Sequence, residues 1–484
     1  MRLLLVIIEG QLYLAGIIAI FVAELALLLW GLLSRRPIVG LLAVFVTLPL
    51  IRTTVSAIRA CFIRIPAPEG LPLERSEGTA LYDLVEEIGR AVDAPPIDGV
   101  TLSGGFDASA AIDTPSWWLR RRRTLVLGFP VLSTLSLPEL RAVIAHELAH
   151  FSSAHDPFAA WVYRTRASWL ALRTALDRRS ATPVYVYWLL RWYEPRLNAA
   201  SAEVSRRHEL VADRVAAKVA GTRAAADALV GFESGARFAD DTHWPAIEIS
   251  HETAAAPPRP YSQMLTWNAR QTSTELLASL LAADPESDDT HPSLRERLTR
   301  FGETARMPLP IAKSAGHELL GPALERLARR LDERWMARHR DSWLQHRAEH
   351  VERTTTLDRL AGIEMPTPDE LFERAHLVET LHGSDHALPI YQSAAAQGHA
   401  AANLAAGRVL LDRLDAAGIA LIEAAMDRDE RLVPEGCRIL AVYYTAINQE
   451  LAARKCAWRA SRYATRAHLA RQAIASSAVR DTSS

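Results

Sequence analysis

The N-terminal region contains the feature that most restricts how this chain can fold. Residues 10–33 read GQLYLAGIIAIFVAELALLLWGLL, an apolar run of 24 residues in which Glu24 is the one charged side chain. As an α-helix the run would extend about 36 Å, which exceeds the roughly 30 Å hydrocarbon core of a bilayer. A cleaved signal peptide has a shorter apolar region that ends at small residues. The run therefore predicts a helix that crosses a membrane.

A second uncharged run, PIVGLLAVFVTLPLI, occupies residues 37–51 but would cover only about 22 Å as a helix. It can span a bilayer only if the helix continues past Arg52, whose long side chain would reach the interface. The other interpretation is a helix that lies in the interface or in a protein core. We predict the hairpin, with residues 1–65 as a membrane anchor of one or two transmembrane helices in contact with lipid.

Arginines around the anchor predict which side of the membrane the remaining chain occupies. In a hairpin they divide four against two, as Arg2, Arg52, Arg59 and Arg64 against Arg35 and Arg36. Positive residues favour the cytoplasmic side, so everything after residue 65, including any catalytic domain, is predicted to be cytoplasmic. Of the 55 basic residues only Lys218, Lys313 and Lys455 are lysines. This bias indicates a GC-rich bacterial genome and hence a bacterial inner membrane.

Overall charge and cysteine usage exclude two classes of protein. The 55 Lys and Arg against 56 Asp and Glu give a net charge of -1, whereas a nucleic-acid-binding protein carries a basic excess. No nucleic-acid partner is therefore predicted. The three cysteines, Cys61, Cys437 and Cys456, are too few and too widely spaced to form a disulfide framework.

Beyond a Pro/Gly-rich linker after residue 65, the pattern predicts a mainly α-helical protein. Residues 66–305 combine a helix at 81–92, short strands at 99–111 and 124–127, and a helical stretch from 136 to about 235, which together predict a helical domain with a small β-sheet. Residues 306–484 predict Ala-rich helix pairs of about 34 residues, as in tetratricopeptide-type repeats. This C-terminal domain is interpreted either as an arm that binds a protein partner or as a helical cap. His346 and His350 in it are predicted to be ordinary surface and packing residues.

One predicted helix carries a residue pattern that indicates a catalytic metal site. Ser136 and Glu139 form a capping box that starts the helix LPELRAVIAHELAHF. His146 and His150 are four residues apart, so both imidazoles project from one face and can reach a single metal ion. Glu147 lies beside them and can act on a water at that metal. This H-E-x-x-H arrangement is typical of zinc peptidases.

A catalytic zinc needs a third protein ligand and one open position. Glu209 is the best candidate, because it lies on a helical segment with Asp213 four residues further along the same face. Asp213 could orient a ligating imidazole, as carboxylates often do around zinc. Glu203 lies on a different face of that helix. The alternative is that Glu209 and Asp213 are an exposed pair among neighbouring arginines.

These elements together resemble a known family. The HELAH segment, the EL-VAD element within residues 205–213 and THPSLRERL at 290–298 are similar to the HtpX-like and CAAX-prenyl-endopeptidase-like membrane zinc metallopeptidases. The resemblance covers about residues 70–305. It implies a zincin-type, membrane-anchored endopeptidase that cleaves membrane-associated or misfolded proteins or peptides. It also implies Zn²⁺ ligation by His146, His150 and Glu209, with Glu147 as general base and Asp213 as the partner of a ligand.

The resemblance concerns two further residues. Family members carry an Asn-Ala element where substrate backbone docks, and Asp107 of GFDASA stands at the corresponding position. A carboxylate cannot donate the hydrogen bonds of an amide, so substrate docking should differ here. His291 is either a stabiliser of the transition state or a structural residue at a helix entry. The competing function is a membrane-tethered interaction protein whose zinc site is structural or vestigial.

Overall fold

A computed structural model of the protein describes residues 2–33, 38, 44–45, 69–113, 122–151, 184–267, 273–283 and 292–481. The chain divides into two compact units. Unit 1 contains residues 1–250 and 256–340, and unit 2 contains residues 251–255 and 341–484. The domain limits at residues 65 and 305 stay predictions.

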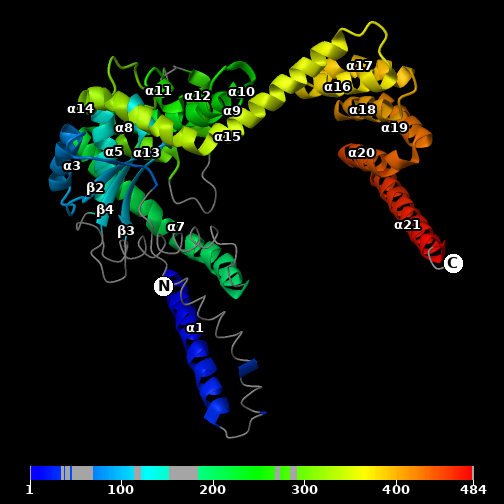
Figure 1. Ribbon diagram of the computed structural model, residues 1–484. Helices are drawn as coiled ribbons and strands as arrows, with labels where there is room; N and C mark the ends of the chain where they lie inside the picture. The colour runs from blue at the N-terminus through cyan, green and yellow to red at the C-terminus, as the bar shows by residue number, and fades with distance from the viewer. Residues whose placement is uncertain are drawn as a thin grey trace. The chain divides into compact units, whose positions relative to one another are not determined.

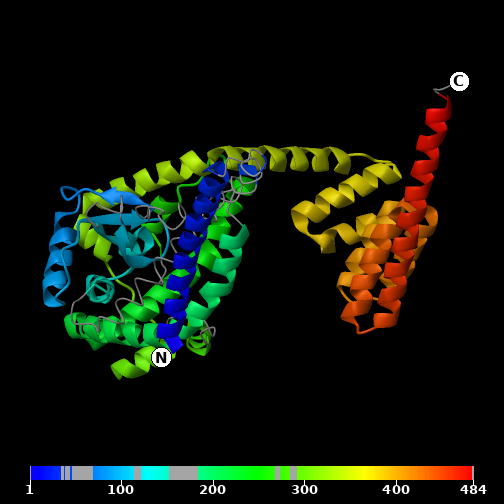
Figure 2. The same cartoon turned by 90° about the horizontal axis from the view of Figure 1, so that it is seen from below.

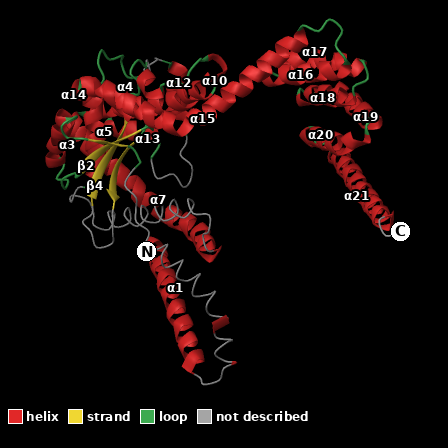
Figure 3. Ribbon diagram, viewed as in Figure 1, coloured by secondary structure: helices red, strands yellow, loops and turns green. Residues whose placement is uncertain are grey.

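Unit 1 surrounds a small mixed sheet with helices (Figures 1 and 3). Its elements in chain order are α1 (Arg2–Leu33), β1 (Leu71–Leu73), α3 (Thr79–Ala91), β2 (Gly99–Ser103), β3 (Ala108–Asp113), β4 (Arg122–Gly128), α4 (Phe129–Thr134), α5 (Leu137–Ala149), α7 (Val184–Ala220), α8 (Thr222–Phe238), the π-helix η1 (Ala239–His243), α9 (Trp244–Glu248), α11 (Pro260–Met264), α12 (Thr274–Ala282), α13 (Leu294–Phe301), α14 (Ala315–Leu320) and the start of α15 (Pro322–Ala361). The short helix α10 (Ser250–Thr253) begins at the last residue of the first segment of unit 1, and its other residues belong to unit 2. The prediction of a mainly helical chain with a small sheet is confirmed.

The sheet has the strand order β1-β2-β4-β3, so β3 is an edge strand among those described. β2 and β4 are parallel, with Leu102 opposite Leu127, and β3 runs antiparallel to β4. The residues of β2 and β4 are nearly all buried, as expected for central strands between layers. Leu125 and Leu127 join Leu140, Ile144 and other residues of α5 in the main core of unit 1.

Helix α1 packs beside α7, and the two run side by side in Figure 2. Tyr13 contacts Trp192 edge to face, with ring centroids 5.3 Å apart. A Cβ at Gly10 would lie 2.3 Å from the Tyr193 hydroxyl oxygen, so glycine permits this close approach. Within the described residues, no helix combines the length and apolar composition needed to cross a membrane. The transmembrane hairpin stays a prediction, and most of its second run lies outside the described residues.

Unit 2 is helical, and each helix from α16 onward packs against the next. Its elements are the C-terminal part of α15, α16 (Pro368–His382), α17 (Ser384–Ala396), α18 (Ala400–Asp412), α19 (Ala417–Arg428), the 3₁₀ turn η2 (Glu430–Leu432), α20 (Val433–Ala446) and α21 (Glu450–Asp481). The first helices of successive pairs begin at residues 368, 400 and 433, an interval of about 33 residues that matches helical repeats. Gly398, at φ 96°, forms the turn before α18.

A buried histidine in unit 1 predicts acid sensitivity. His243 is 6% exposed, its Nδ1 accepts a hydrogen bond from Trp267 Nε1 at 3.1 Å, and burial lowers its pKa to about 4. The unfolded chain binds this proton near pH 6.5, so stability present above pH 6.5 is lost as pH falls towards 4, by about 3 kcal/mol. Glutamine does not titrate in this range. Between pH 7 and pH 4 the free energy of unfolding of His243→Gln, measured with denaturant, should therefore fall by about 3 kcal/mol less than that of wild type. Equal losses would exclude His243 as the titrating group.

Candidate metal centre and its cavity

Helix α5 presents the first part of the site. Its N-terminus has the predicted capping box, in which Ser136 N donates to Glu139 Oε2 at 2.7 Å, and Pro138 occupies the first turn. Leu140, Ile144 and Leu148 are buried in the core, which fixes the rotation of the helix. His146 and Glu147 are half-buried, and both line the cavity described below. His150 follows as the C-cap residue.

Helix α7 supplies the second part. Glu209 and Asp213 are 7% and 3% exposed, so the alternative of an exposed pair is wrong. His146 Nε2 lies 3.3 Å from Glu209 Oε2, and His150 Nε2 lies 3.6 Å from Glu209 Oε1. Glu203, by contrast, is exposed and forms a surface ion pair with Arg207.

The donor set fits zinc. One ligand atom from each of His146, His150 and Glu209 lies within 4.8 Å of the others, so the three could hold one metal ion. Two imidazoles and a carboxylate are the ligands of one well-known class of catalytic zinc site, which leaves a fourth position open. The Nε2 atoms of both histidines face the carboxylate, which makes them the ligating nitrogens.

Residues 118–305, which contain this cluster, match the family model of peptidase family M48. Over this range the chain is similar to that family. M48 enzymes are zinc-dependent hydrolases that act on peptide bonds, so the predicted enzyme class and the Zn²⁺ cofactor are confirmed. The family is consistent with the HtpX-like and CAAX-endopeptidase-like resemblance. A search of curated proteins gives no match to the chain.

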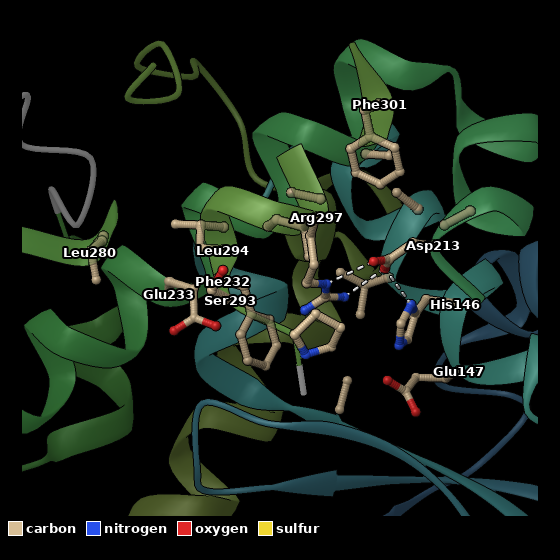
Figure 4. Close-up of a pocket in the computed structure, with 18 of the residues that line it drawn as sticks. His146, Glu147, Asp213, Phe232, Glu233, Leu280, Ser293, Leu294, Arg297 and Phe301 are labelled. Atoms are coloured by element: carbon tan, nitrogen blue, oxygen red, sulfur yellow. Dashed lines mark hydrogen bonds and ion pairs between the residues drawn. The ribbon is translucent and has the colours of Figure 1, made fainter. Parts of the chain in front are cut away.

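An ion-pair network holds His146 in place. Asp213 Oδ1 accepts a hydrogen bond from His146 Nδ1 at 3.1 Å, which directs Nε2 towards Glu209. Arg297 of α13 donates to the same carboxylate from Nε at 2.8 Å and from Nη2 at 2.6 Å. Figure 4 shows Asp213 between the guanidinium and the imidazole. Asp213 therefore orients a ligand, as the sequence predicts, and Arg297 in turn fixes Asp213.

The charges in this network are strongly coupled. Burial alone would raise the pKa of Asp213, but the hydrogen bonds with Arg297 and His146 outweigh it and lower that pKa to about 2. Burial alone would lower the pKa of His146, whereas its hydrogen bonds with Asp213 and Glu209 raise it to about 10 in the metal-free protein. A zinc ligand must be a neutral imidazole, so His146 would lose its Nε2 proton on binding Zn²⁺.

Sequence reasoning missed two neighbours of the ligands. Arg297 lies within the THPSLRERL element, but nothing in its local spacing identifies which of three arginines in α13 faces inward. His208 precedes Glu209 and is buried, with its ring 5.5 Å from that of His150. The sequence signal that could have identified His208 is its position next to the candidate ligand Glu209.

A cavity of about 600 Å³ opens beside the three candidate metal ligands. Figure 4 shows His146 and Glu147 on one wall, with Phe232, Leu280 and Leu294 opposite. The lining residues come from β3 and its preceding loop and from α5, α7, α8, α12 and α13: Phe106, Asp107, Ala108, Ala142, Val143, His146, Glu147, Asp213, Ala216, Ala225, Ala228, Leu229, Phe232, Glu233, Leu280, Ala283, Pro292, Ser293, Leu294, Arg297 and Phe301. Most of these side chains are apolar, so the cavity suits a large apolar group next to the metal.

Asp107 lies at the edge of this cavity, in the loop before β3. Its Oδ1 accepts a hydrogen bond from Ser103 Oγ, and its carbonyl oxygen accepts one from Gly128 N at 2.7 Å. A Cβ at Gly128 would lie 2.2 Å from the Gly105 carbonyl oxygen, so glycine allows the loop to close over β4. His291 lies outside the described residues, and its role stays a prediction. Pro292, the next residue, lines the cavity.

Proposed function

We propose that this protein is a membrane-anchored zinc endopeptidase that hydrolyses membrane-associated or misfolded proteins. The observation that carries the peptidase part is the meeting of His146, His150 and Glu209, of which His146 lines a cavity together with Glu147. A site closed by four protein ligands would instead suit the alternative of a structural zinc in an interaction protein. Among the described residues the cluster contains three candidate ligands, and this number together with the adjoining cavity favours catalysis.

Each residue of the site has its own proposed role in the reaction. Zn²⁺, when bound, supplies a Lewis acid and lowers the pKa of a coordinated water. Glu147 accepts the proton of the attacking water and then delivers it to the leaving amine. Asp213 keeps His146 in the tautomer whose Nε2 faces the ligand cluster. His291 is proposed to stabilise the transition state.

Substrate backbone is proposed to bind along β3. This strand is an edge among the described strands, and edge strands leave N–H and C=O groups that an extended peptide can pair with. Phe106, Asp107 and Ala108 place its start on the cavity. The Asp107 carboxylate accepts hydrogen bonds but cannot donate them, so it would select substrate N–H groups. The apolar wall would receive a large apolar side chain next to the scissile bond.

The membrane part of the proposal rests on α1. This helix exposes many large apolar side chains, among them Leu12 at 65%, Trp30 at 63% and Leu33 at 78%, which is costly in water. Together with the arginine bias, they support attachment to a bacterial inner membrane with the catalytic domain in the cytoplasm. The helical C-terminal unit is proposed to bind a protein partner.

Vesicle flotation tests the membrane proposal. We expect the full chain, mixed with phospholipid vesicles, to float with them and to remain bound in high salt, because apolar burial rather than charge holds it. Leu12→Glu with Leu33→Glu should weaken flotation, whereas Leu309→Glu, a matched change at an exposed leucine outside α1, should not. Protein that stays at the bottom of the gradient would contradict the anchor.

A further inference from the structure

Three histidines outside the peptidase site meet in unit 2. His251, in α10, faces α15, where His346 and His350 are four residues apart. The ring centroid of His251 lies 5.4 Å from that of His346 and 6.3 Å from that of His350. His346 is exposed, while His251 and His350 are half-buried, so an ion and its water can reach the cluster.

These spacings suit imidazoles that share a metal ion. Zinc binds imidazole nitrogen at about 2.0–2.1 Å, which places two rings on one tetrahedral ion about 5 Å apart, centre to centre. The ligand pair His146 and His150 has a centroid separation of 5.0 Å. His346 and His350 have the same i, i+4 spacing on one helix face. The ligand nitrogens of the three histidines do not all lie within 4.8 Å of one another, so binding of one ion would require their side chains to rotate.

The backbone around His251 is already held against α15. Arg347 Nη1 donates to the carbonyl oxygen of His251 at 3.0 Å and to that of Glu252 at 2.8 Å. A cation site assembled from two chain segments loses less conformational freedom on binding when the segments are docked beforehand. The guanidinium is engaged with the two carbonyl oxygens.

We propose that His251, His346 and His350 form a second metal site, which takes a divalent transition-metal ion such as Zn²⁺. Imidazole ligands favour zinc, copper and nickel over calcium and magnesium, which prefer oxygen. The ion would join residues 251–255 to α15 and thereby stabilise unit 2. This site is separate from the peptidase centre and does not depend on the proposed function.

Zinc stoichiometry of the full chain tests this site. Zn²⁺ retained against a chromophoric chelator of micromolar affinity should be two equivalents for wild type and one for His346→Ala or His350→Ala. Loss of residues that merely orient zinc ligands costs 10–100-fold in affinity, so loss of a ligand should weaken this site at least tenfold. Zn²⁺ should also raise the melting temperature of His150→Ala but not that of His150→Ala with His346→Ala.

The matched control is His339→Ala. His339 is an exposed histidine on the same helix, but it stacks on Trp335 away from the cluster, and its loss should leave two equivalents. A wild type that retains one equivalent, and keeps it after His346→Ala, would overturn the second site, as would a His346→Ala or His350→Ala variant that binds zinc like wild type. If instead His150→Ala retains two equivalents, the peptidase centre is misassigned while the second site stands.

Discussion

Glu147→Gln is expected to lower peptide-bond hydrolysis by about 10²–10⁴-fold, the usual contribution of a general base. Glu147 lines the cavity, but it is not one of the three candidate metal ligands. Glutamine has the same shape and cannot accept the proton of the attacking water. Zinc content and melting temperature should therefore stay at wild-type values. The measurements are kcat/KM on an unfolded protein substrate such as casein and zinc per chain.

Glu203→Gln is the matched control for this substitution. Glu203 is an exposed carboxylate on α7, the helix that carries Glu209, and its ion pair with Arg207 lies on the surface. Exposed pairs of this kind contribute little to stability, so cleavage should be unchanged. Full cleavage by a zinc-loaded Glu147→Gln protein would exclude Glu147 as the base.

The sequence predicted α5 well because its signals are local. The capping box at Ser136 and Glu139 fixes the helix start, and the four-residue spacing of His146 and His150 then determines their common face. Both follow from neighbouring residues, so no tertiary contact was needed to predict them. The same reasoning excluded Glu203 and selected Glu209 on α7.

Contacts across long sequence separations could not be predicted in this way. Arg297 is 84 residues from Asp213, and its inward direction depends on how α13 packs against α7 and α8. His346 and His350 show a metal-binding spacing, yet the sequence predicted ordinary surface residues because His251, the third member, comes from a distant segment. The spacing of residues within one helix shows which of them share a face. Which residues from a distant segment contact that face depends on the tertiary fold.

Arg297→Ala is the second substitution with a large expected effect. Arg297 and Asp213 are both largely buried, with side chains 11% and 5% exposed. Removing the guanidinium leaves a buried carboxylate without its main counter-charge, which typically costs about 3–5 kcal/mol. The lowered pKa of Asp213 should rise towards ordinary values, because Arg297 is the first of the groups that lower it. Denaturant unfolding of the metal-free protein measures the stability loss.

The same variant should bind zinc about 10–100-fold more weakly, as expected when a group that orients a ligand is lost. Asp213 would no longer be held where it accepts the His146 Nδ1 hydrogen bond, so His146 Nε2 would sample other directions. Arg300→Ala is the control, because Arg300 lies on α13 and forms a surface ion pair with Glu296. Since Arg297 does not ligate, excess zinc should restore part of the activity of Arg297→Ala but none of that of Glu147→Gln. Wild-type zinc affinity in Arg297→Ala would limit Arg297 to a structural role.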